Sequence, residues 1–505
     1  MKLGQLAEDY GVTIPEPSWV ELEFSRVVSD SRHVEPGSLF VAIRGSRYDG
    51  HCFIPDACSR GAVAVLGERP AAEVAGAAGG VPYIQVKEVR RLLGELSQRL
   101  AGRPAGRLKV VGITGTNGKT STLFMLRSIL EAGGHSCALV GTISYEIGGS
   151  REESIQTTPA PEALAAQMAE ALSSGSEYFL MEVSSHALDQ ERVAGVEFDV
   201  AIFTNLSRDH LDYHRDMAEY RQAKLKLFTS LGVEPYNTKQ PKFIVTNADD
   251  PVSEAICAVA KVPVYSYGVA CEGAAFRASD IELGLGRTRF CLTTPDGTVP
   301  FDIALSGIHN VYNALGAIAA ASLLGVGIDA VRDGLGRVKG VPGRFELVSD
   351  EPGFAVIVDY AHTEDGLRNL LQAARSVSRG RLIVVFGCGG DRDRGKRPVM
   401  GEVAARLADF VVLTSDNPRS EDPVRIILDI EVGMQRAGKA KGEHYRVIVD
   451  RAEAIRYALT VARPNDMVII AGKGHERYQL VGDRRIPFDD REVALRLIRE
   501  LAAGR

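Results

Sequence analysis

A glycine-rich turn between a strand and a helix constrains the fold of this chain more than any other feature. The stretch VVGITGTNGKTST, residues 110–122, begins in an apolar strand and contains Gly118, Lys119 and Thr120. Backbone N–H groups at such a turn bind phosphate, the lysine adds a positive charge, and the threonine hydroxyl can reach Mg²⁺. A standard P-loop would have its first glycine at position 113, where this chain has Ile113. The turn predicts a nucleotide-binding α/β domain with a shifted loop; the alternative is a glycine-rich turn with a solvated lysine.

The segments after the turn alternate between apolar strands and helices. A helix is expected from Lys119 to Glu131, with apolar residues at helical spacing and a Gly-Gly pair at its end. The strands CALVGT, YFLMEV, FDVAIFT and KFIVTN follow, and a long helix is expected at HNVYNALGAIAAASLL. This order is typical of a domain built on a parallel sheet.

Chain length and two linker-like stretches predict three domains. A chain of 505 residues is too long for a single hydrophobic core. The stretches AGRPAGR (101–107) and GRVKGVPGRFE (336–346) are rich in glycine and contain proline, as linkers are. We expect domains at residues 1–104, 105–338 and 339–505.

Four apolar strands of the last third each run into a polar cluster. They are FAVIVDYAH, RLIVVFGCGGDRD, DFVVLTSDNPR and DMVIIAGKGHE. Continuous apolar runs fit parallel strands that are buried on both faces. Ligands bind beyond the carboxyl ends of such strands, so the four clusters are expected to meet at one edge of a sheet.

Composition excludes several classes of protein. A net charge of −6 disfavours a nucleic-acid partner, because nucleic-acid binders carry basic patches. The N-terminus lacks the apolar region of a signal peptide, and no run reaches the roughly 18 apolar residues of a membrane span. The seven cysteines are scattered and form no C-x-x-C pair. We expect a cytoplasmic protein that is not inserted into a membrane.

Polar residues downstream of the turn suggest metal ligands. Glu182 and Ser184 lie at the end of the strand YFLMEV, where a carboxylate could hold a metal. His210 and His214 follow in NLSRDHLDYH; a zinc site would want more such ligands, whereas one histidine on a second Mg²⁺ is plausible.

Lys224 lies on the apolar face of a predicted helix. In EYRQAKLKLF the apolar residues follow helical spacing, and Lys224 shares their face. Burial would lower the pKa of the amine and favour its neutral form. A neutral amine reacts with CO₂ to give a carbamate, which is an anionic oxygen ligand. The pattern alone favours the alternative, in which the lysine stem is buried and its ammonium reaches water.

Seven motifs in order resemble the Mur ligase family. They are GTNGKT, MEVSSHAL, TNLSRDHLDYH, AKLKLF, HNVYN, GVPGRFE and DYAH, and the similarity runs from about residue 25 to 490. That family builds the peptide of bacterial cell-wall precursors by ATP-dependent amide-bond formation. The resemblance implies a small N-terminal α/β UDP-binding domain, a central P-loop-type parallel-sheet ATPase domain and a C-terminal Rossmann-like α/β domain. The shifted glycine is the family's form of the loop, and the family's matching lysine is carbamylated.

The resemblance also implies roles for residues that match the family motifs. The expected cofactors are ATP and Mg²⁺. The catalytic residues would be Lys119, Glu182, His210 and Lys224. The metal ligands would be Thr120, Glu182, His210 and carbamylated Lys224. The ATP contacts would be Gly115, Thr116, Asn117, Gly118, Lys119, Thr120, Ser121, His309, Asn310, Asn313, Arg344 and Asp359.

Two further stretches, SDSRHVEPGSLFVAIRGSRYDGH and QTTPAPEAL, resemble the family member that adds the third residue of the peptide. Its nucleotide-sugar substrate is UDP-N-acetylmuramoyl-L-alanyl-D-glutamate. The implied contacts are Ser29, Ser31, Ser46, Arg47, Tyr48, Gln156, Thr157, Thr158, Ser184, Gln190 and Arg192. Gln156 departs from the family's asparagine, which weakens that one contact.

The motif DNPR bears on which amino acid is added. Lysine and meso-diaminopimelate are the usual third residues, and only diaminopimelate carries a second carboxylate. Arginine binds a carboxylate through two hydrogen bonds, and the family's diaminopimelate enzymes carry D-N-P-R. The expected diaminopimelate contacts are Arg392, Asp416, Asn417, Pro418, Arg419, Gly472 and Glu476. The alternative for Arg419 is a surface arginine after a proline turn.

The expected reaction is phosphorylation of the D-glutamyl γ-carboxylate by ATP, followed by attack of the diaminopimelate amine on the acyl phosphate. We expect a monomer. The enzyme alternatives are the lysine-adding homologue and a ligase like folylpolyglutamate synthetase. A P-loop switch protein would need a guanine-reading N-K-x-D motif, which is not found. The set Lys119, Glu182, His210 and Lys224 argues against a non-catalytic binding module.

Overall fold

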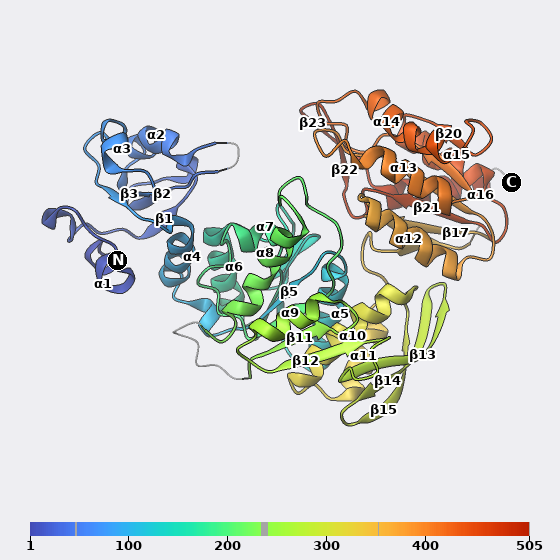
Figure 1. The fold of residues 1–505 in the computed structure, drawn as a ribbon, viewed down its shortest axis with the longest axis horizontal. Coiled ribbons are helices and arrows are strands. Elements are labelled where there is room, and N and C mark those ends of the chain that lie inside the picture. The colour runs from blue at the N-terminus through green and yellow to red at the C-terminus, as the bar shows by residue number, and fades with distance from the viewer. Residues whose placement is uncertain (46–47, 234–240, 352, 504–505) are drawn as a thin grey trace.

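The computed structural model describes residues 1–45, 48–233, 241–351 and 353–503. Within these residues the strands form three large sheets and one two-stranded hairpin. The sheets follow one another along the chain, from the blue N-terminal body through the green and yellow centre to the red C-terminal body (Figure 1). This arrangement confirms the predicted three-domain α/β fold. The boundaries at 104/105 and 338/339 stay predictions.

The N-terminal sheet is parallel, with the strand order β1-β2-β3-β4. Its strands are β1 (Arg26–Val28), β2 (Ser38–Ala42), β3 (Ala62–Gly67) and β4 (Tyr83–Gln85). The helices of this part are α1 (Gly4–Tyr10), α2 (Ile54–Ser59), α3 (Ala71–Ala78) and α4 (Val89–Leu100). Helix α4 lies between this sheet and the central body (Figure 1).

The central sheet has the order β15-β14-β13-β12-β11-β10-β5-β9-β6-β7-β8. Its parallel strands are β5 (Lys109–Thr114), β6 (Cys137–Val140), β9 (Tyr178–Glu182), β10 (Val200–Phe203), β11 (Phe243–Asn247), β12 (Val264–Gly268) and β13 (Phe276–Gly284). Antiparallel strands extend both edges: β7 (Ser144–Ile147), β8 (Ser150–Glu153), β14 (Arg287–Thr294) and β15 (Gly297–Ile303). Strand β5, which carries the phosphate-binding turn, therefore lies inside the sheet.

The helices around the central sheet include the expected one after the turn. They are α5 (Lys119–Ala132), α6 (Pro161–Ser173), α7 (Ser185–Asp189), α8 (Met217–Ser230), α9 (Val252–Val259), α10 (Ile308–Leu323) and α11 (Ile328–Arg337). The predicted apolar face of α5 is buried, and Gly133 caps its end. Helix α10 is alanine-rich and buried on several sides. Among the described helices, none combines the length and apolar character needed to cross a lipid bilayer.

The C-terminal sheet has the order β16-β17-β21-β18-β19-β20, and only β16 is antiparallel to its neighbour within the described residues. Its strands are β16 (Glu346–Ser349), β17 (Ala355–Asp359), β18 (Leu382–Phe386), β19 (Phe410–Leu413), β20 (Tyr445–Val447) and β21 (Met467–Ala471). The hairpin comprises β22 (Tyr478–Val481) and β23 (Arg484–Pro487). The helices are α12 (Glu364–Val377), α13 (Lys396–Leu407), α14 (Pro423–Arg436), α15 (Arg451–Val461) and α16 (Asp490–Ala503). The four predicted strands are thus neighbours in one parallel sheet.

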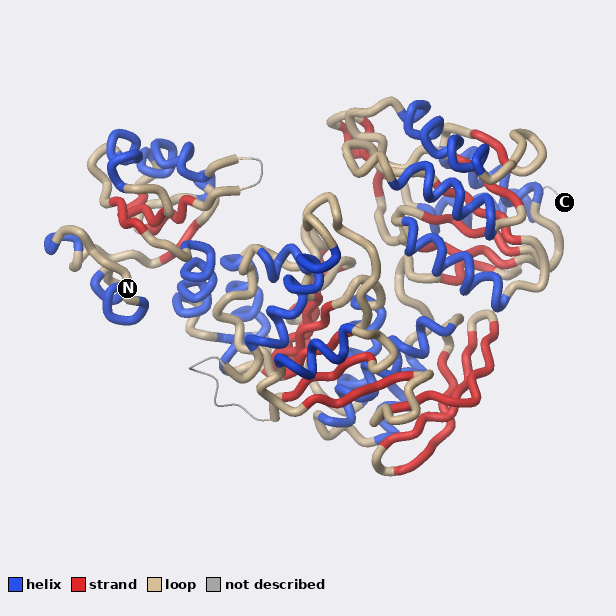
Figure 2. The backbone as a smooth tube through the Cα atoms, in the orientation of Figure 1, coloured by secondary structure: helices blue, strands red, loops and turns tan. Residues whose placement is uncertain are grey.

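Alternate residues of the apolar strands enter different hydrophobic cores. In β5, Val111 and Ile113 pack on one face of the sheet and Val110 on the other. In β18, Val384 belongs to one core and Val385 to the opposite one. Helices cover the sheet faces (Figure 2). This burial on both faces explains why the strands read as continuous apolar runs.

Candidate active site

The predicted phosphate-binding turn joins β5 to α5 and is held by the segment that follows β10. The amide N–H of Thr116 donates to the carbonyl oxygen of Asn205 (2.8 Å), and that of Asn117 donates to Asn205 Oδ1 (3.0 Å). Gly118 has a positive φ of 86° and caps the N-terminus of α5. The turn thus opens directly into a helix N-terminus, as phosphate binding requires.

Gly115 is the position in the turn that excludes a side chain. Its φ is +149°, and a Cβ there would lie 1.8 Å from Thr204 Oγ1. Gly115→Ala is therefore expected to destabilise the central domain by about 1–3 kcal/mol, measured by scanning calorimetry. Gly336→Ala on α11 is the control, because a Cβ there meets nothing within 4 Å. Equal stability of the two variants would contradict this view of the turn.

Two lysine amines converge on one carbonyl oxygen of the turn. Lys119 Nζ lies 2.9 Å and Lys224 Nζ 2.8 Å from the oxygen of Gly115, and both donate to it. The Lys224 side chain is only 2% exposed, and its ammonium lies over the ring of Tyr220. The alternative with the lysine head in water is therefore wrong. Burial, aided by the neighbouring Lys119, holds the pKa of the Lys224 amine well below its usual value.

Glu182 lies fully buried at the end of β9 and accepts three hydrogen bonds. Thr120 Oγ1 donates to its Oε1 (2.9 Å), as does the N–H of Thr142 (2.8 Å), and Thr142 Oγ1 donates to Oε2 (2.9 Å). The carboxylate is thereby fixed beside the first turn of α5. The sequence identified Thr120 and Glu182 but gave no signal for Thr142, because its role depends on where the β6–β7 connection folds.

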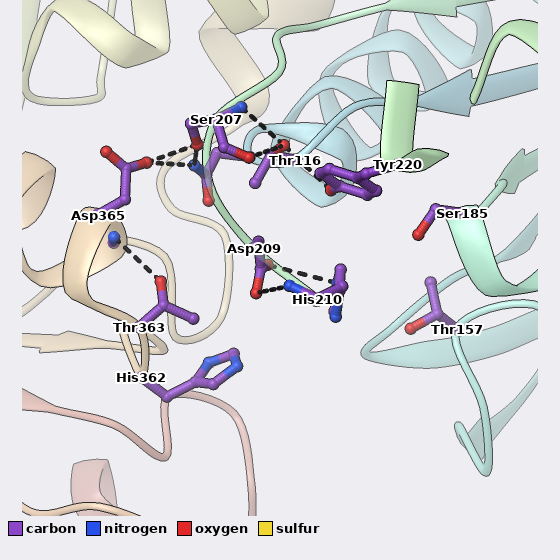
Figure 3. A network of polar contacts seen from close by, with 12 residues as sticks. Thr116, Thr157, Ser185, Ser207, Asp209, His210, Tyr220, His362, Thr363 and Asp365 are labelled. Atoms are coloured by element: carbon purple, nitrogen blue, oxygen red, sulfur yellow. Dashed lines mark hydrogen bonds and ion pairs between the residues drawn. The ribbon is translucent and has the colours of Figure 1, made fainter. Parts of the chain in front are cut away.

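His210 lies in the loop after β10 beside a carboxylate. Its Nε2 is 3.3 Å from Asp209 Oδ2, and burial lowers the pKa of His210 to about 4. His362 of the C-terminal domain points toward this pair (Figure 3). Burial would raise the pKa of Asp209, but the imidazoles of His210 and His362 hold it below its usual value. His214 is buried, with Nε2 3.1 Å from Ser185 Oγ.

The described residues contain no cluster of three or more His, Cys, Asp or Glu side chains placed to hold a metal ion. The expected Mg²⁺ ligands nevertheless include oxygen atoms that the structure brings together. Thr120 Oγ1 and Glu182 Oε1 lie 2.9 Å apart at the N-terminal turn of α5. Hydroxyl and carboxylate oxygens are ligands that Mg²⁺ accepts, so this pair fits the ion.

Asp365 connects the C-terminal domain to the turn. Its Oδ2 accepts from Ser207 Oγ (2.6 Å), as Figure 3 shows. The same oxygen accepts from Asn117 Nδ2 (3.3 Å). Thr116 Oγ1 donates to the backbone carbonyl oxygen of Ser207 (3.2 Å) and lies 3.1 Å from Tyr220 Oη. The sequence carries no signal for Asp365, because nothing in the pattern of α12 indicates which domain its first turn faces.

Two other predicted nucleotide contacts come from the C-terminal domain: Arg344 lies between α11 and β17, and Asp359 is the last residue of β17. Arg344 Nη2 lies 3.4 Å from Thr120 Oγ1, its guanidinium covers the ring of Tyr360, and its buried Nε has no partner among the described residues. Asp359 accepts from the N–H groups of Phe345 and Ala361, and burial raises its pKa. An arginine from the third domain therefore reaches the phosphate-binding turn.

The start of α10 packs against the same turn. Asn313 Nδ2 donates to Asn310 Oδ1 (3.1 Å), and a Cβ at Gly118 would lie 2.3 Å from Asn313 Oδ1. His309 precedes them and packs against the ring of Phe345. Ser121 is buried in α5. The structure thus gathers most of the predicted nucleotide contacts around one helix N-terminus.

The partly buried His309 gives a pH dependence to stability. Burial lowers its pKa from 6.5 to about 4, so between these values the unfolded chain binds a proton that the folded chain does not. Stability should fall as pH drops from about 6.5 to 4, and His309→Asn should make that fall shallower in urea titrations. His33→Asn, at an exposed histidine, should leave it unchanged. Parallel curves for wild type and His309→Asn would contradict the prediction.

The predicted muramyl-peptide contacts form a connected network beside Glu182. Arg192 Nη1 donates to Gln156 Oε1 (2.7 Å) and to the carbonyl oxygen of Thr158 (3.1 Å), and its other nitrogens donate to Gln190 Oε1. Thr158 Oγ1 donates to the backbone carbonyl oxygen of Glu182 (2.8 Å). The longer glutamine at 156 therefore still reaches the arginine.

The other predicted contacts to the nucleotide-sugar substrate lie partly in the central domain and partly in the N-terminal domain. Thr157 Oγ1 lies 3.2 Å from Thr142 Oγ1, and the N–H of Ser184 donates to Thr158 Oγ1. In the N-terminal domain, the N–H of Ser29 donates to Glu162 Oε1 of α6 (2.8 Å). Ser31 is buried and Tyr48 is 74% exposed. Ser46 and Arg47 lie outside the described residues.

The predicted amino-acid contacts meet at the carboxyl ends of β18, β19 and β21. Arg419 has a positive φ of 52°, and its Nη1 donates to the carbonyl oxygen of Gly390 (2.8 Å). Asn417 Nδ2 donates to Glu476 Oε2 (2.8 Å). Pro418, which lies between Asn417 and Arg419 in the sequence, is buried. A Cβ at Gly472 would lie 2.5 Å from Asp416 Oδ2, an oxygen without a hydrogen bond among the described residues. Arg392 is exposed. The DNPR and GKGHE motifs therefore form one site.

Comparisons with known proteins agree with this geometry. Three family models match: "Mur ligase family, catalytic domain" at residues 23–100, "Mur ligase middle domain" at 113–321 and "Mur ligase, glutamate ligase domain" at 343–474. The chain belongs to the Mur ligase family. Within it, a protein of Syntrophomonas wolfei named UDP-N-acetylmuramoyl-L-alanyl-D-glutamate–2,6-diaminopimelate ligase is 44% identical over 99% of both chains. A Geobacillus thermodenitrificans protein of the same name is 46% identical over 93% of this chain and 94% of its own.

Solved structures of Mur ligases also resemble this chain. A structure of a UDP-N-acetylmuramoyl-L-alanyl-D-glutamate–2,6-diaminopimelate ligase has a TM-score of 0.69 and 31% identity, covering 98% of this chain and 99% of its own. A folylpolyglutamate synthase of Mycobacterium tuberculosis, solved with ADP and AMPPCP, has a TM-score of 0.61 but 20% identity, covering 76% and 92%. The second likeness shows a shared fold alone.

Proposed function

We propose that this Mur ligase adds meso-2,6-diaminopimelate to the D-glutamyl γ-carboxylate of UDP-N-acetylmuramoyl-L-alanyl-D-glutamate, with hydrolysis of ATP. The observation that carries the proposal is the similarity at 43–46% identity, over nearly the whole chain, to curated relatives with this activity in their name. The product is a precursor of the bacterial cell wall. The lysine-adding and folate-type alternatives do not have this support.

The chemistry needs an activated carboxylate, because a carboxylate does not react with an amine at neutral pH. The γ-carboxylate oxygen attacks the terminal phosphorus of ATP, and ADP leaves. The amine of diaminopimelate then attacks the carbonyl carbon, the amine proton passes to solvent, and phosphate leaves with the attacking oxygen. Negative charge builds up on phosphoryl oxygens in both steps, so positioning and electrostatics supply the catalysis.

The residues at the turn fit these steps. The ammonium of Lys119, which donates to the carbonyl oxygen of Gly115, would turn from that oxygen to bind the transferring phosphoryl group. Arg344 adds a second cation from the C-terminal domain, close to Thr120. His309, Asn310, Asn313 and Asp359 would hold the rest of the nucleotide. The contact of Asp365 with Asn117 supports an arrangement in which the C-terminal domain covers bound ATP.

Mg²⁺ would be held by Thr120 and Glu182, and a second ion by His210 and carbamylated Lys224. When bound, the ions would neutralise charge on the phosphate oxygens. Carbamylation is supported by the burial of Lys224 and its low pKa, because a neutral amine can attack CO₂ and release a proton. A carbamate on Lys224 would add a negative charge beside the amine of Lys119 at the carbonyl of Gly115.

The two remaining substrates would bind on either side of the turn. The muramyl dipeptide would contact Thr157, Thr158, Ser184, Gln190 and Arg192, and its UDP group would reach Ser29, Ser31 and Tyr48. Diaminopimelate would place its distal carboxylate on Arg419 and Arg392, and its distal ammonium near Glu476. The arginine fork favours diaminopimelate over lysine, because lysine has no distal carboxylate and would leave the guanidinium unpaired.

We further propose that the enzyme works as a monomer in the cytoplasm, with domains at 1–104, 105–338 and 339–505. Its seven cysteines are all free, which suits a reducing compartment. All the proposed substrate contacts lie on one chain, so the site does not need a second copy.

Isotope transfer tests the reaction. UDP-N-acetylmuramoyl-L-alanyl-D-glutamate with heavy oxygen in the γ-carboxylate is incubated with ATP, Mg²⁺ and diaminopimelate. The phosphate released should carry one heavy oxygen, and its release should require both the nucleotide sugar and the amino acid. Unlabelled phosphate formed alongside amide product would contradict the acyl-phosphate route, and no amide product would contradict the function.

A further inference from the structure

Lys473 is a buried lysine at the proposed amino-acid site with no assigned role. It follows β21 in the motif GKGHE, and its side chain is 0% exposed. A buried ammonium is costly unless it is paired, so its partners indicate what it does.

The ammonium of Lys473 joins the two motifs of the site. Its Nζ lies 2.9 Å from Glu476 Oε2 and 3.2 Å from Asn417 Oδ1. Asn417 Nδ2 donates to the same oxygen of Glu476 (2.8 Å), which closes a triangle of three side chains. The N–H of Leu480 also donates to Asn417 Oδ1 (3.0 Å), so the orientation of the amide is fixed. One oxygen of Glu476 is therefore fully engaged.

The ionisable groups around the triangle do not replace the charge of Lys473. Arg451 is paired with Asp490, with contacts of 2.6 and 2.7 Å. Asp416 Oδ1 accepts from the N–H of Asn417, and Arg419 donates to Gly390. Among the residues that the structure describes, Lys473 is thus the cation that pairs with Glu476, and it neutralises that carboxylate.

We infer that Lys473 determines specificity by preventing Glu476 from binding a lone ammonium group. This inference rests on the proposed function. L-Lysine has only an ammonium at its distal end, and a neutralised Glu476 attracts it weakly. Diaminopimelate is held through its distal carboxylate on Arg419, and its ammonium then reaches Glu476 as part of a zwitterion. Discrimination by lowered affinity for the wrong substrate is a common device.

The test is the ratio of kcat/KM for meso-diaminopimelate to that for L-lysine. Lys473→Met keeps the length of the side chain and removes its charge, so the ratio should fall by about tenfold or more, mainly through a lower KM for lysine. Lys473→Arg should keep the ratio near that of wild type. Lys441→Met, at an exposed lysine of the same domain, is the control. An equal loss with both substrates would overturn the inference, because a purely structural role would not change the ratio.

A second variant, Glu476→Gln, tests the same ion pair by removing the charge of the carboxylate. Glu476→Gln leaves Lys473 unneutralised, so lysine should be used even less well while diaminopimelate also binds more weakly. Improved use of lysine by Glu476→Gln would overturn the inference, even where Lys473→Met fails to fold. Wild type is measured first: absence of diaminopimelate turnover there would reject the proposed function and not the role of Lys473.

Discussion

Lys224→Met is expected to lower the rate of amide-bond formation by about 10³-fold, with little change in stability. The methionine removes the amine that would become a carbamate, and with it an anionic ligand for the second Mg²⁺. An apolar side chain suits a position that is 2% exposed, so folding should persist. The rate is measured as phosphate release with all three substrates present, and folding by circular dichroism.

A matched control lies two residues away on the same helix. Lys226 is partly exposed and pairs with Asp189, so Lys226→Met should keep most of the activity. Isotopically labelled bicarbonate should give a carbamate signal in the carbon NMR spectrum of wild type and not of Lys224→Met. Full activity of Lys224→Met would remove Lys224 from the mechanism. If Lys224→Met is inactive but wild type gives no carbamate signal, Lys224 would take part as an amine and not as a carbamate.

Arg419→Ala is expected to lower kcat/KM for meso-diaminopimelate by about 10³–10⁴-fold while changing that for L-lysine little. The distal carboxylate would lose a fork of two charge-assisted hydrogen bonds and would keep only the exposed Arg392 as a cation. Lysine has no such carboxylate and therefore loses nothing. The measurement is steady-state kinetics with each amino acid varied at saturating ATP and nucleotide sugar.

Arg406→Ala is the control for this substitution, because Arg406 is an exposed arginine on α13 that pairs with Glu402. Its kinetics should match wild type. Arg419→Lys should recover only a small part of the loss, since an ammonium cannot form the bidentate contact. A similar fall for both amino acids with Arg419→Ala would show that Arg419 supports the fold of the loop and does not select the substrate.

The parallel strands and their polar ends could be predicted from the sequence because both follow from local pattern. The strand β18 alternates between two cores and so reads as one apolar run, and the cluster after it lies at the sheet edge by topology. The helix α5 was predicted within one residue of its end. The antiparallel strands β7, β8, β14 and β15 were not anticipated, because edge pairing depends on tertiary context.

The parts of the site that sequence could not provide are contacts between distant segments. Spacing placed Lys224 on an apolar face, but only the fold shows that its amine and that of Lys119 reach the same carbonyl oxygen. Asp365 lies on a helix of one domain and binds Asn117 of another. Lys473 is a polar residue in a motif, and its burial against Glu476 has no local signature.

A competition experiment tests the central claim most directly. Purified protein is given ATP, Mg²⁺, UDP-N-acetylmuramoyl-L-alanyl-D-glutamate and equal concentrations of meso-diaminopimelate and L-lysine, and the products are separated by mass spectrometry. The account predicts that the diaminopimelate tripeptide is formed in large excess, with one ATP consumed per amide bond. A lysine tripeptide in comparable amount, or ATP consumption without either product, would contradict it.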